Sequence, residues 1–319
     1  MTKHEPDPLS EINKIQVELA LFDMKLLPPH ITKSKMDFSI EGKDIRFGLL
    51  SIKGISDKAV EKINNFKNEF SDKFEIFRAA SEAKLNIGVL SALIQAGSLE
   101  GFKQSRSKVV LEAQLWHILT VTEKKYASHF AKKFDYDLVE IIKHLREFKN
   151  EKSKVIIKDS RYETIKKKYL PYLEIYTKNS QSESFANWYY EKMLLGYTYN
   201  KDLKDIFADK RSDLMSVRTV NALAARSQAV FVGQVDDQWR GRSKNGNSYL
   251  KAIVSDESGT TPVMIFSKKM EDCESMNGSL PQKKNIVIVK GSKADGVVFA
   301  DLIAVQDNKV YTRLSELKN

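Results

Sequence analysis

The chain has 319 residues, 42% of them hydrophobic and 29% charged, which is enough apolar material for packed cores in two or three domains. Its formal net charge of +10 suits a polyanionic partner, nucleic acid before an anionic membrane, although a lysine-rich solvated surface would give the same sum. No apolar run is long enough for a transmembrane helix, the N-terminus lacks a signal-peptide core, and the single Cys273 excludes an internal disulfide. We therefore expect a cytoplasmic protein that does not enter a membrane.

Helical periodicity dominates the first two thirds of the chain, from residue 9 to about residue 207. Within it, residues 45–60 predict a helix end, a turn at Gly54 and a new amphipathic helix, which together form a helix-hairpin-helix. Gly54 lets the backbone approach a phosphate, and the amides that open the second helix carry the positive end of its dipole. We expect the turn to bind the DNA backbone without reading sequence. A plain helix-turn-helix corner is the alternative. The residues of this predicted duplex site are Lys53, Gly54, Ile55, Ser56 and Lys58.

A second, weaker hairpin follows, where Leu90, Leu93 and Ile94 lead into a turn at Gly97. Basic residues lie just beyond this turn and extend the predicted duplex site. They are Lys103, Arg106 and Lys108. Further on, residues 143–168 hold ten lysines or arginines against four acids, a local net charge of +6. Such runs are usually solvated helix faces.

From about residue 228 the apolar period shortens to that of strands. Three strand-like runs (230–235, 249–254, 261–266) precede a polar helix at 267–276, and two more follow at 286–289 and 297–299. This order, with a glycine-bearing hairpin between the first two strands, is that of the five-stranded OB-fold barrel. Another small barrel is the alternative.

The barrel also predicts a single-strand DNA site, because OB folds combine a basic groove with aromatic platforms. We expect the loop after the first strand to carry Trp239, Arg240, Arg242 and Lys244. The second strand adds Tyr249 and Lys251, which are two residues apart and so share one face, while Leu250 points into the core. The alternative is that Trp239 caps the barrel end and the charges are solvated.

Catalytic signatures are missing from the sequence. No HExxH, zinc-finger, Walker or Rossmann spacing occurs, and there is no G-x-S-x-G elbow. A polymerase holds two metal ions with paired aspartates. Asp135 and Asp137 have Asp-x-Asp spacing but are expected in a helix, where their side chains diverge. We therefore predict no catalytic residue and no metal site or cofactor on this chain.

Several motifs resemble the alpha subunit of bacterial DNA polymerase III, a family C polymerase. They are LLPPHITKS at 26–34, IRFGL at 45–49, IKG at 52–54, LIQAGSL at 93–99 and WYYEKMLLGY at 188–197, followed by SDESG at 255–259 in the barrel. The motifs come in the family's order, with residues 110–180 matching least. Ser56 and His30 depart from the family pattern, and the family's SGHPL motif after Tyr197 is absent.

The resemblance implies an α+β architecture in four parts: a fingers-like segment at 1–45, a tandem helix-hairpin-helix at 46–120, a helical connector at 121–215 and an OB domain at 216–310. It implies the DNA-binding C-terminal half of a split DNA-directed DNA polymerase, gripping duplex and single-stranded DNA. The partner would be a catalytic chain with palm and thumb, where Mg²⁺ would bind. A free-standing DNA-binding accessory protein and an assembly scaffold are alternatives.

The sliding clamp is a further candidate partner, because family members carry a clamp-binding peptide near this region. Residues 181–185, QSESF, match that peptide loosely in composition. A polar linker is the alternative.

Overall fold

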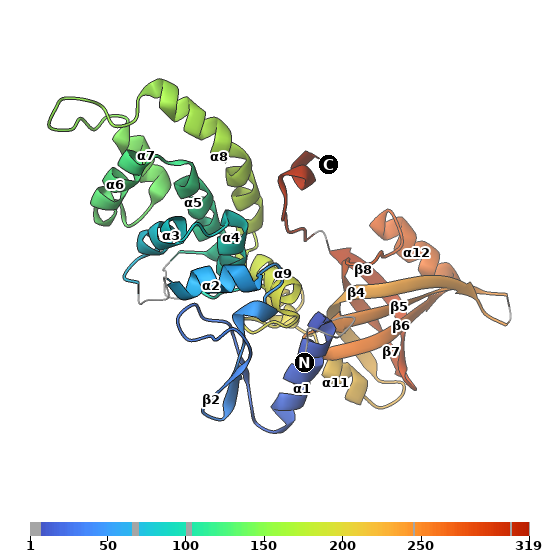
Figure 1. Ribbon diagram of the computed structural model, residues 1–319. Helices are drawn as coiled ribbons and strands as arrows, with labels where there is room; N and C mark the ends of the chain where they lie inside the picture. The colour runs from blue at the N-terminus through green and yellow to red at the C-terminus, as the bar shows by residue number, and fades with distance from the viewer. Residues whose placement is uncertain (1–7, 66–69, 100–103, 245, 307, 319) are drawn as a thin grey trace. The chain divides into compact units, whose positions relative to one another are not determined.

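The structure, a computed structural model, describes residues 8–65, 70–99, 104–244, 246–306 and 308–318 (Figure 1). The chain forms two compact units, Met1–Gly196 with Val310–Asn319 and Tyr197–Lys309. Residues 197–215, which the sequence assigned to the connector, belong to the second unit. None of the described helices combines the length and apolar character needed to cross a membrane.

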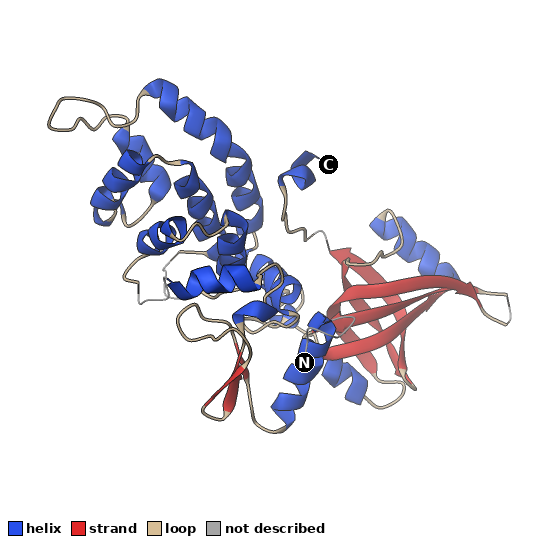
Figure 2. Ribbon diagram, in the orientation of Figure 1, coloured by secondary structure: helices blue, strands red, loops and turns tan. Residues whose placement is uncertain are grey.

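The first unit is mainly helical (Figure 2). Its helices in chain order are α1 Pro8–Leu21, η2 Leu49–Ser51, α2 Asp57–Asn65, α3 Lys73–Glu82, α4 Ile87–Gln95, α5 Arg106–Ile118, α6 Val121–Phe130, η3 Lys132–Phe134, α7 Leu138–Leu145, α8 Asp159–Ser180, α9 Glu183–Leu195 and η4 Leu314–Lys318. Helix α5 packs against α3, α4, α7 and α8, and its Trp116 stacks on Phe74 of α3 with ring centroids 5.1 Å apart.

A small sheet interrupts the helical region, contrary to the sequence prediction. Strand β3 (Asp44–Arg46) pairs in parallel with β1 (Leu26–Leu27) and antiparallel with β2 (Ser39–Glu41). Arg46 of β3 links the three strands of this sheet, because its guanidinium donates hydrogen bonds to the Glu41 carboxylate of β2 and to the carbonyl oxygen of Pro28, which follows β1. Strands of two or three residues are too short to show period-two alternation, so the sequence pattern could not reveal them.

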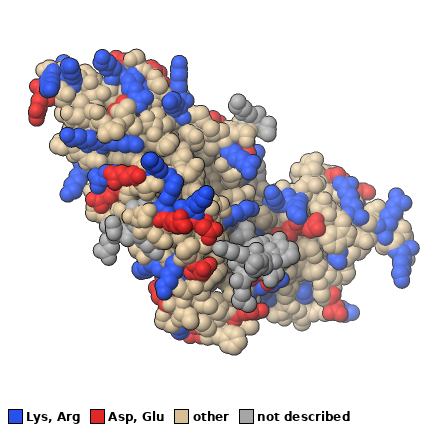
Figure 3. Space-filling view, in the orientation of Figure 1, with Lys and Arg blue, Asp and Glu red and all other residues tan. Residues whose placement is uncertain are grey.

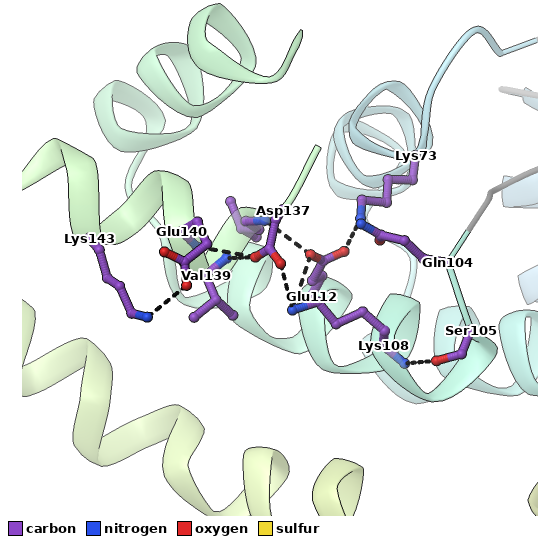
Figure 4. A network of polar contacts seen from close by, with 10 residues as sticks. Lys73, Gln104, Ser105, Lys108, Glu112, Asp137, Val139, Glu140 and Lys143 are labelled. Carbon is purple, nitrogen blue, oxygen red and sulfur yellow. Dashed lines mark hydrogen bonds and ion pairs between the residues drawn. The ribbon is translucent and has the colours of Figure 1, made fainter. Parts of the chain in front are cut away.

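A buried ion pair joins three helices of this unit (Figure 4). Lys73 at the start of α3 pairs with Glu112 of α5, and Glu112 also accepts the backbone N–H of Leu138 at the start of α7, at 3.0 Å. Lys73 is 2% exposed and Glu112 0%. Burial lowers the pKa of Lys73 and raises that of Glu112, and the attraction between the two charges opposes both shifts.

The second unit contains the predicted OB-fold barrel. Its strands are β4 Gln228–Arg242, β5 Ser248–Asp256, β6 Gly259–Phe266, β7 Ile286–Ala294 and β8 Val297–Gln306. They close in the order β4-β5-β6-β8-β7, and α12 (Ser267–Asn277) comes between β6 and β7 in the chain. The α+β class and the five-stranded barrel are therefore confirmed, with a core of alternate strand residues such as Phe231, Leu250 and Val289.

The β5–β6 turn fixes two short helices that precede the barrel. Asp256 accepts the N–H of Val217 in α11 (Val217–Ala222) at 2.8 Å. Its neighbour Glu257 accepts the N–H of Leu203 in α10 (Leu203–Ile206) at 3.1 Å. Burial, with repulsion from the Asp256 carboxylate, raises the pKa of Glu257 to about 7.

Candidate nucleic-acid interface

The first hairpin lies between η2 and α2. The sequence predicted an α-helix before the turn, and this was wrong: a single 3₁₀ turn, Leu49–Ser51, follows strand β3 there. Leu49 has no exposed surface, and Ile52 and Ile55 are also buried, so apolar side chains anchor both arms of the turn. Helix α2 buries Ala59, Val60 and Ile63, as its amphipathic pattern predicts.

The turn presents backbone and charge to the exterior. Gly54 has a φ of +89°, and a Cβ placed on it would have no neighbour within 4 Å. Lys53, Gly54, Ser56 and Lys58 are all exposed, whereas Ile55 is 7% exposed and anchors the loop. The backbone N–H groups of Gly54, Ser56 and Lys58 find no acceptor within the described part of the chain. Open amides beside a helix N-terminus are an arrangement that suits a phosphate group, and binding of duplex DNA at this turn stays a prediction.

Ser56, the departure from the family's usual glycine, directly precedes helix α2. Its carbonyl oxygen accepts the N–H of Val60 at 3.0 Å, and its hydroxyl lies 3.4 Å from the N–H of Ala59. The serine thus supplies an N-cap while leaving the amides at positions 54, 56 and 58 open.

Helix α9 supports both hairpins. The carbonyl oxygen of Leu194 accepts the N–H of Lys53 at 2.9 Å, so the end of α9 fixes the first turn. Glu191, fully buried, pairs with Arg106 at the start of α5 at 2.8 Å. The 188–197 motif therefore contacts both hairpins: its helix accepts the N–H of Lys53 through Leu194 and the Arg106 guanidinium through Glu191.

The second hairpin turns inward. Helix α4 ends in a Schellman motif, in which Gly97 (φ +76°) and Ser98 donate to the carbonyl oxygens of Ile94 and Leu93. Gly97 and Ser98 are both buried, and Ile31 donates its N–H to Ser98 at 2.8 Å. The predicted contact at Lys103 lies outside the described residues.

Arg106 and Lys108, also predicted to bind duplex DNA, have acidic partners inside the unit. The side chain of each is 17% exposed. Arg106 pairs with Glu191, and Lys108 lies 3.0 Å from Asp137 and 4.0 Å from Glu112. Burial raises the pKa of Asp137, but the N–H groups of Glu140 and Val139 and the Lys108 ammonium outweigh it, so the pKa is lowered. The charges of Arg106 and Lys108 therefore serve the packing of α5, and their role in duplex binding stays a prediction.

The sequence analysis expected Asp135 and Asp137 within a helix, and this was wrong. Asp135 closes η3 with a φ of +47°, and Asp137 is the N-cap of α7. Within the described ranges no group of three or more His, Cys, Asp or Glu side chains has the geometry to hold a metal ion.

On the barrel, three of the predicted single-strand residues share one outer face. Trp239 is opposite Lys251 in the β4–β5 ladder, and the Lys251 ammonium lies 5.1 Å from the centre of its ring. Tyr249 is on the same face, two residues from Lys251, and Leu250 between them is 1% exposed, as predicted. Trp239 was expected in a loop, but β4 runs on to Arg242 and carries it on the strand.

Arg240 and Arg242 lie on the opposite face of β4 from Trp239. Arg240 is opposite the inward-facing Leu250 and reaches Glu274 of α12 at 3.7 Å. Lys244 is exposed in the β4–β5 turn. The structure therefore gathers Trp239, Tyr249 and Lys251, and separates them from the two arginines.

Two aromatic side chains that the sequence analysis missed extend this face. Phe266 of β6 lies 5.8 Å from Tyr249, and Phe299 of β8 lies 5.8 Å from Phe266, ring centre to ring centre. Phe299 is 42% exposed and Trp239 40%. We call Trp239, Tyr249, Phe266 and Phe299 the aromatic row. Strand alternation placed Phe266 and Phe299 opposite the core positions, and that signal could have found them.

Known proteins match both the hairpin region and most of the whole chain. The helix-hairpin-helix motif family matches residues 23–109. The DNA polymerase III subunit alpha of Campylobacter jejuni is 24% identical over 90% of this chain and 23% of its own length. The subunit of Deinococcus radiodurans is 22% identical over 79% of this chain and 18% of its own length. The subunit of Aquifex aeolicus is 35% identical over 28% of this chain and 8% of its own length.

Among solved structures, the mitochondrial single-stranded DNA binding protein Rim1 of S. cerevisiae aligns over 27% of this chain and all of its own at 16% identity. Its TM-score of 0.23 is too low to support the fold assignment, which depends on the strand pairing. The chain spans about a fifth of the length of the polymerase subunits that it matches over most of its own length. The chain is therefore similar over most of its length to bacterial DNA polymerase III alpha subunits, in the helix-hairpin-helix and OB region of their C-terminal portion.

Proposed function

We propose that this chain is the DNA-binding C-terminal half of a split family C replicative polymerase, acting in the cytoplasm with a separate catalytic chain. The first hairpin carries the proposal: Lys53, Gly54, Ser56 and Lys58 are exposed together beside open backbone amides. Amides and lysines bind phosphate but do not distinguish bases, which suits a protein that must move along any duplex. The aromatic row is proposed to bind the single-stranded template.

The test is binding of the full chain to a primed template over a range of salt concentrations. Lys53→Glu with Lys58→Glu should lower the salt slope by about 2, because about one counterion is released for each phosphate contact. The matched control is Lys25→Glu with Lys35→Glu, which changes the net charge equally at exposed positions. A double variant whose slope equals that of the parent contradicts the hairpin site.

Catalysis is assigned to the partner chain, because the one Asp-x-Asp spacing in this sequence, at Asp135 and Asp137, falls at the end of η3 and the N-cap of α7. The partner would bind Mg²⁺ and supply the palm and thumb. The purified chain alone, given magnesium, nucleotides and primed template, should not extend the primer; extension would contradict the proposal. Co-purification under native conditions should recover the catalytic chain.

The clamp-binding segment is not part of the proposal. Residues 183–185 lie in the first turn of α9, and Phe185 is 2% exposed with its ring stacked 5.8 Å from that of Trp188. A peptide that binds by inserting an aromatic side chain needs that side chain exposed.

A further inference from the structure

A basic loop between α7 and α8 lies outside both proposed DNA sites. Of the ten cations in residues 143–168, three form ion pairs: Lys143 with Glu140, Arg146 with Asp159 and Arg161 with Glu123. No ion pair involves the other seven, all of which the structure describes. They are Lys149, Lys152, Lys154, Lys158, Lys166, Lys167 and Lys168. The same residues 143–168, all of which are described, contain three acids without an ion pair, Glu147, Glu151 and Glu163. Lysine and arginine side chains gather at this α6–α8 end of the helical unit (Figure 3).

The loop holding Lys149, Lys152 and Lys154 has a fixed conformation. Residues 149 and 155 form an antiparallel bridge, and Asn150 donates its N–H to Lys154 at 3.0 Å. The Asn150 side chain accepts the N–H groups of Lys152 at 3.1 Å and Lys154 at 3.0 Å. All three lysines are exposed. A braced loop loses little backbone entropy when its charges bind a ligand.

The base of the loop is anchored in the unit. Phe148 contacts Phe130 of α6 with ring centres 4.8 Å apart, and the N–H of Ile157 bonds the carbonyl oxygen of Leu145 at 3.1 Å. Ile157 is fully buried. The lysines are thus presented by a well-anchored element rather than by a loose tail.

We propose that the loop at 149–154 is a second contact with duplex DNA, on the phosphate backbone beyond the segment held by the first hairpin. The proposal rests on the proposed DNA-binding function. Lysine ammonium groups act as point charges, which suit phosphates without specifying a sequence. The loop tip at 150–154 carries no apolar side chain, whereas a membrane-binding loop would insert one.

The test is the triple variant Lys149→Glu, Lys152→Glu and Lys154→Glu in the full chain, measured on duplexes of increasing length. The variant should match the parent on the shortest duplex that binds and fall below it on longer ones. On long duplexes the salt slope should drop by about 2 to 3, with affinity near 0.1 M salt reduced at least about tenfold. The control triple, Lys25→Glu, Lys33→Glu and Lys35→Glu, should leave this length dependence intact.

Each outcome separates the two proposals. A loop variant that binds long duplexes like the parent overturns the second contact and leaves the hairpin untouched. Loss with the loop variant but none with Lys53→Glu and Lys58→Glu supports the loop and contradicts the hairpin. Loop-dependent binding to phosphatidylserine vesicles without any loop-dependent DNA binding would assign the loop to a membrane and overturn the inference.

Discussion

The phenol ring of Tyr249 lies directly over Gly241 on the neighbouring strand. The two residues are opposite each other in the β4–β5 ladder, and a Cβ on Gly241 would lie 2.5 Å from both the Cζ and the hydroxyl oxygen of the ring. The Tyr249 ring, the second of the aromatic row, therefore occupies the space that a side chain at position 241 would need.

Gly241→Ala should displace the Tyr249 ring and weaken binding of oligo-dT. The alanine methyl meets the far end of a side chain that can rotate, so the barrel should stay folded while the ring moves. A displaced platform should weaken binding about fivefold or more, within the effect of one stacked base. In a Tyr249→Ala background the same change should have no further effect, and an additional loss there would show that Gly241 acts by another route.

Phe299→Ala should weaken single-strand binding to a similar extent. Phe299 lies at the β8 end of the row, and its removal takes away one stacking surface worth about 1–3 kcal/mol per base. Affinity for oligo-dT at fixed salt is the measurement. Met276→Ala, at another exposed apolar residue on α12, is the control. Equal affinities of parent and Phe299→Ala would exclude Phe299 from the site.

The strands of the barrel were predictable because each buries one face, which imposes alternation on the sequence. The end of β4 was not predictable, because it extends past the closed part of the barrel: after a register shift at Asp236, residues 237–242 pair only with β5. Both faces there carry polar residues, so no alternation marks the strand, and Trp239 was assigned to a loop. Phe266 and Phe299, which were missed, lie on predicted strands next to core residues, so strand alternation places their side chains on the outer face.

Arg106 and Lys108 show what a sequence cannot give. A basic residue beside a hairpin turn predicts phosphate binding only if no acid meets it in the fold. The partner of Arg106 is Glu191, 85 residues away, and that of Lys108 is Asp137 at the N-cap of α7. Local sequence carries no signal for such pairs. Lys53 and Lys58 flank the hairpin turn and are exposed, and their contact with duplex DNA stays a prediction.

Asp57→Asn should raise affinity for duplex DNA. Asp57 opens helix α2 between Ser56 and Lys58 and is exposed, so its carboxylate repels a phosphate at the open amides. Removing one like charge there should tighten binding by about threefold or more at low salt, and less as salt screens it. The cost is about 0.3–1 kcal/mol of helix stability, since an acid favours a helix N-terminus. Weaker binding by a folded variant would contradict the phosphate site.

Glu112→Gln should destabilise the helical unit by about 3 kcal/mol, because it leaves the Lys73 ammonium buried without its counter-charge. Replacing both members, Lys73→Met with Glu112→Leu, should cost less than the sum of the single changes. Urea unfolding followed by far-ultraviolet circular dichroism measures both. The exposed pair Lys143–Glu140 is the control, and its loss should cost less than about 0.5 kcal/mol. Additive single effects would contradict a coupled pair.

The stability of the barrel unit should fall as pH rises through 7, because of Glu257. Its folded pKa is raised to about 7 from an ordinary value of 4.5, so folding favours the protonated acid. That stabilisation is complete below about pH 4.5, declines between there and pH 7, and is lost above the folded pKa. Glu257→Gln keeps a neutral acceptor for the Leu203 N–H, so it should remove this pH dependence and stabilise the unit by about 2 kcal/mol at pH 8. The stability of the unit is measured from pH 5 to 8 by hydrogen exchange of the β5 amides, followed by mass spectrometry and corrected for intrinsic rates. Asp205→Asn, on the exterior of α10, is the control. Parallel stability curves for parent and Glu257→Gln would show that Glu257 stays ionised in the fold.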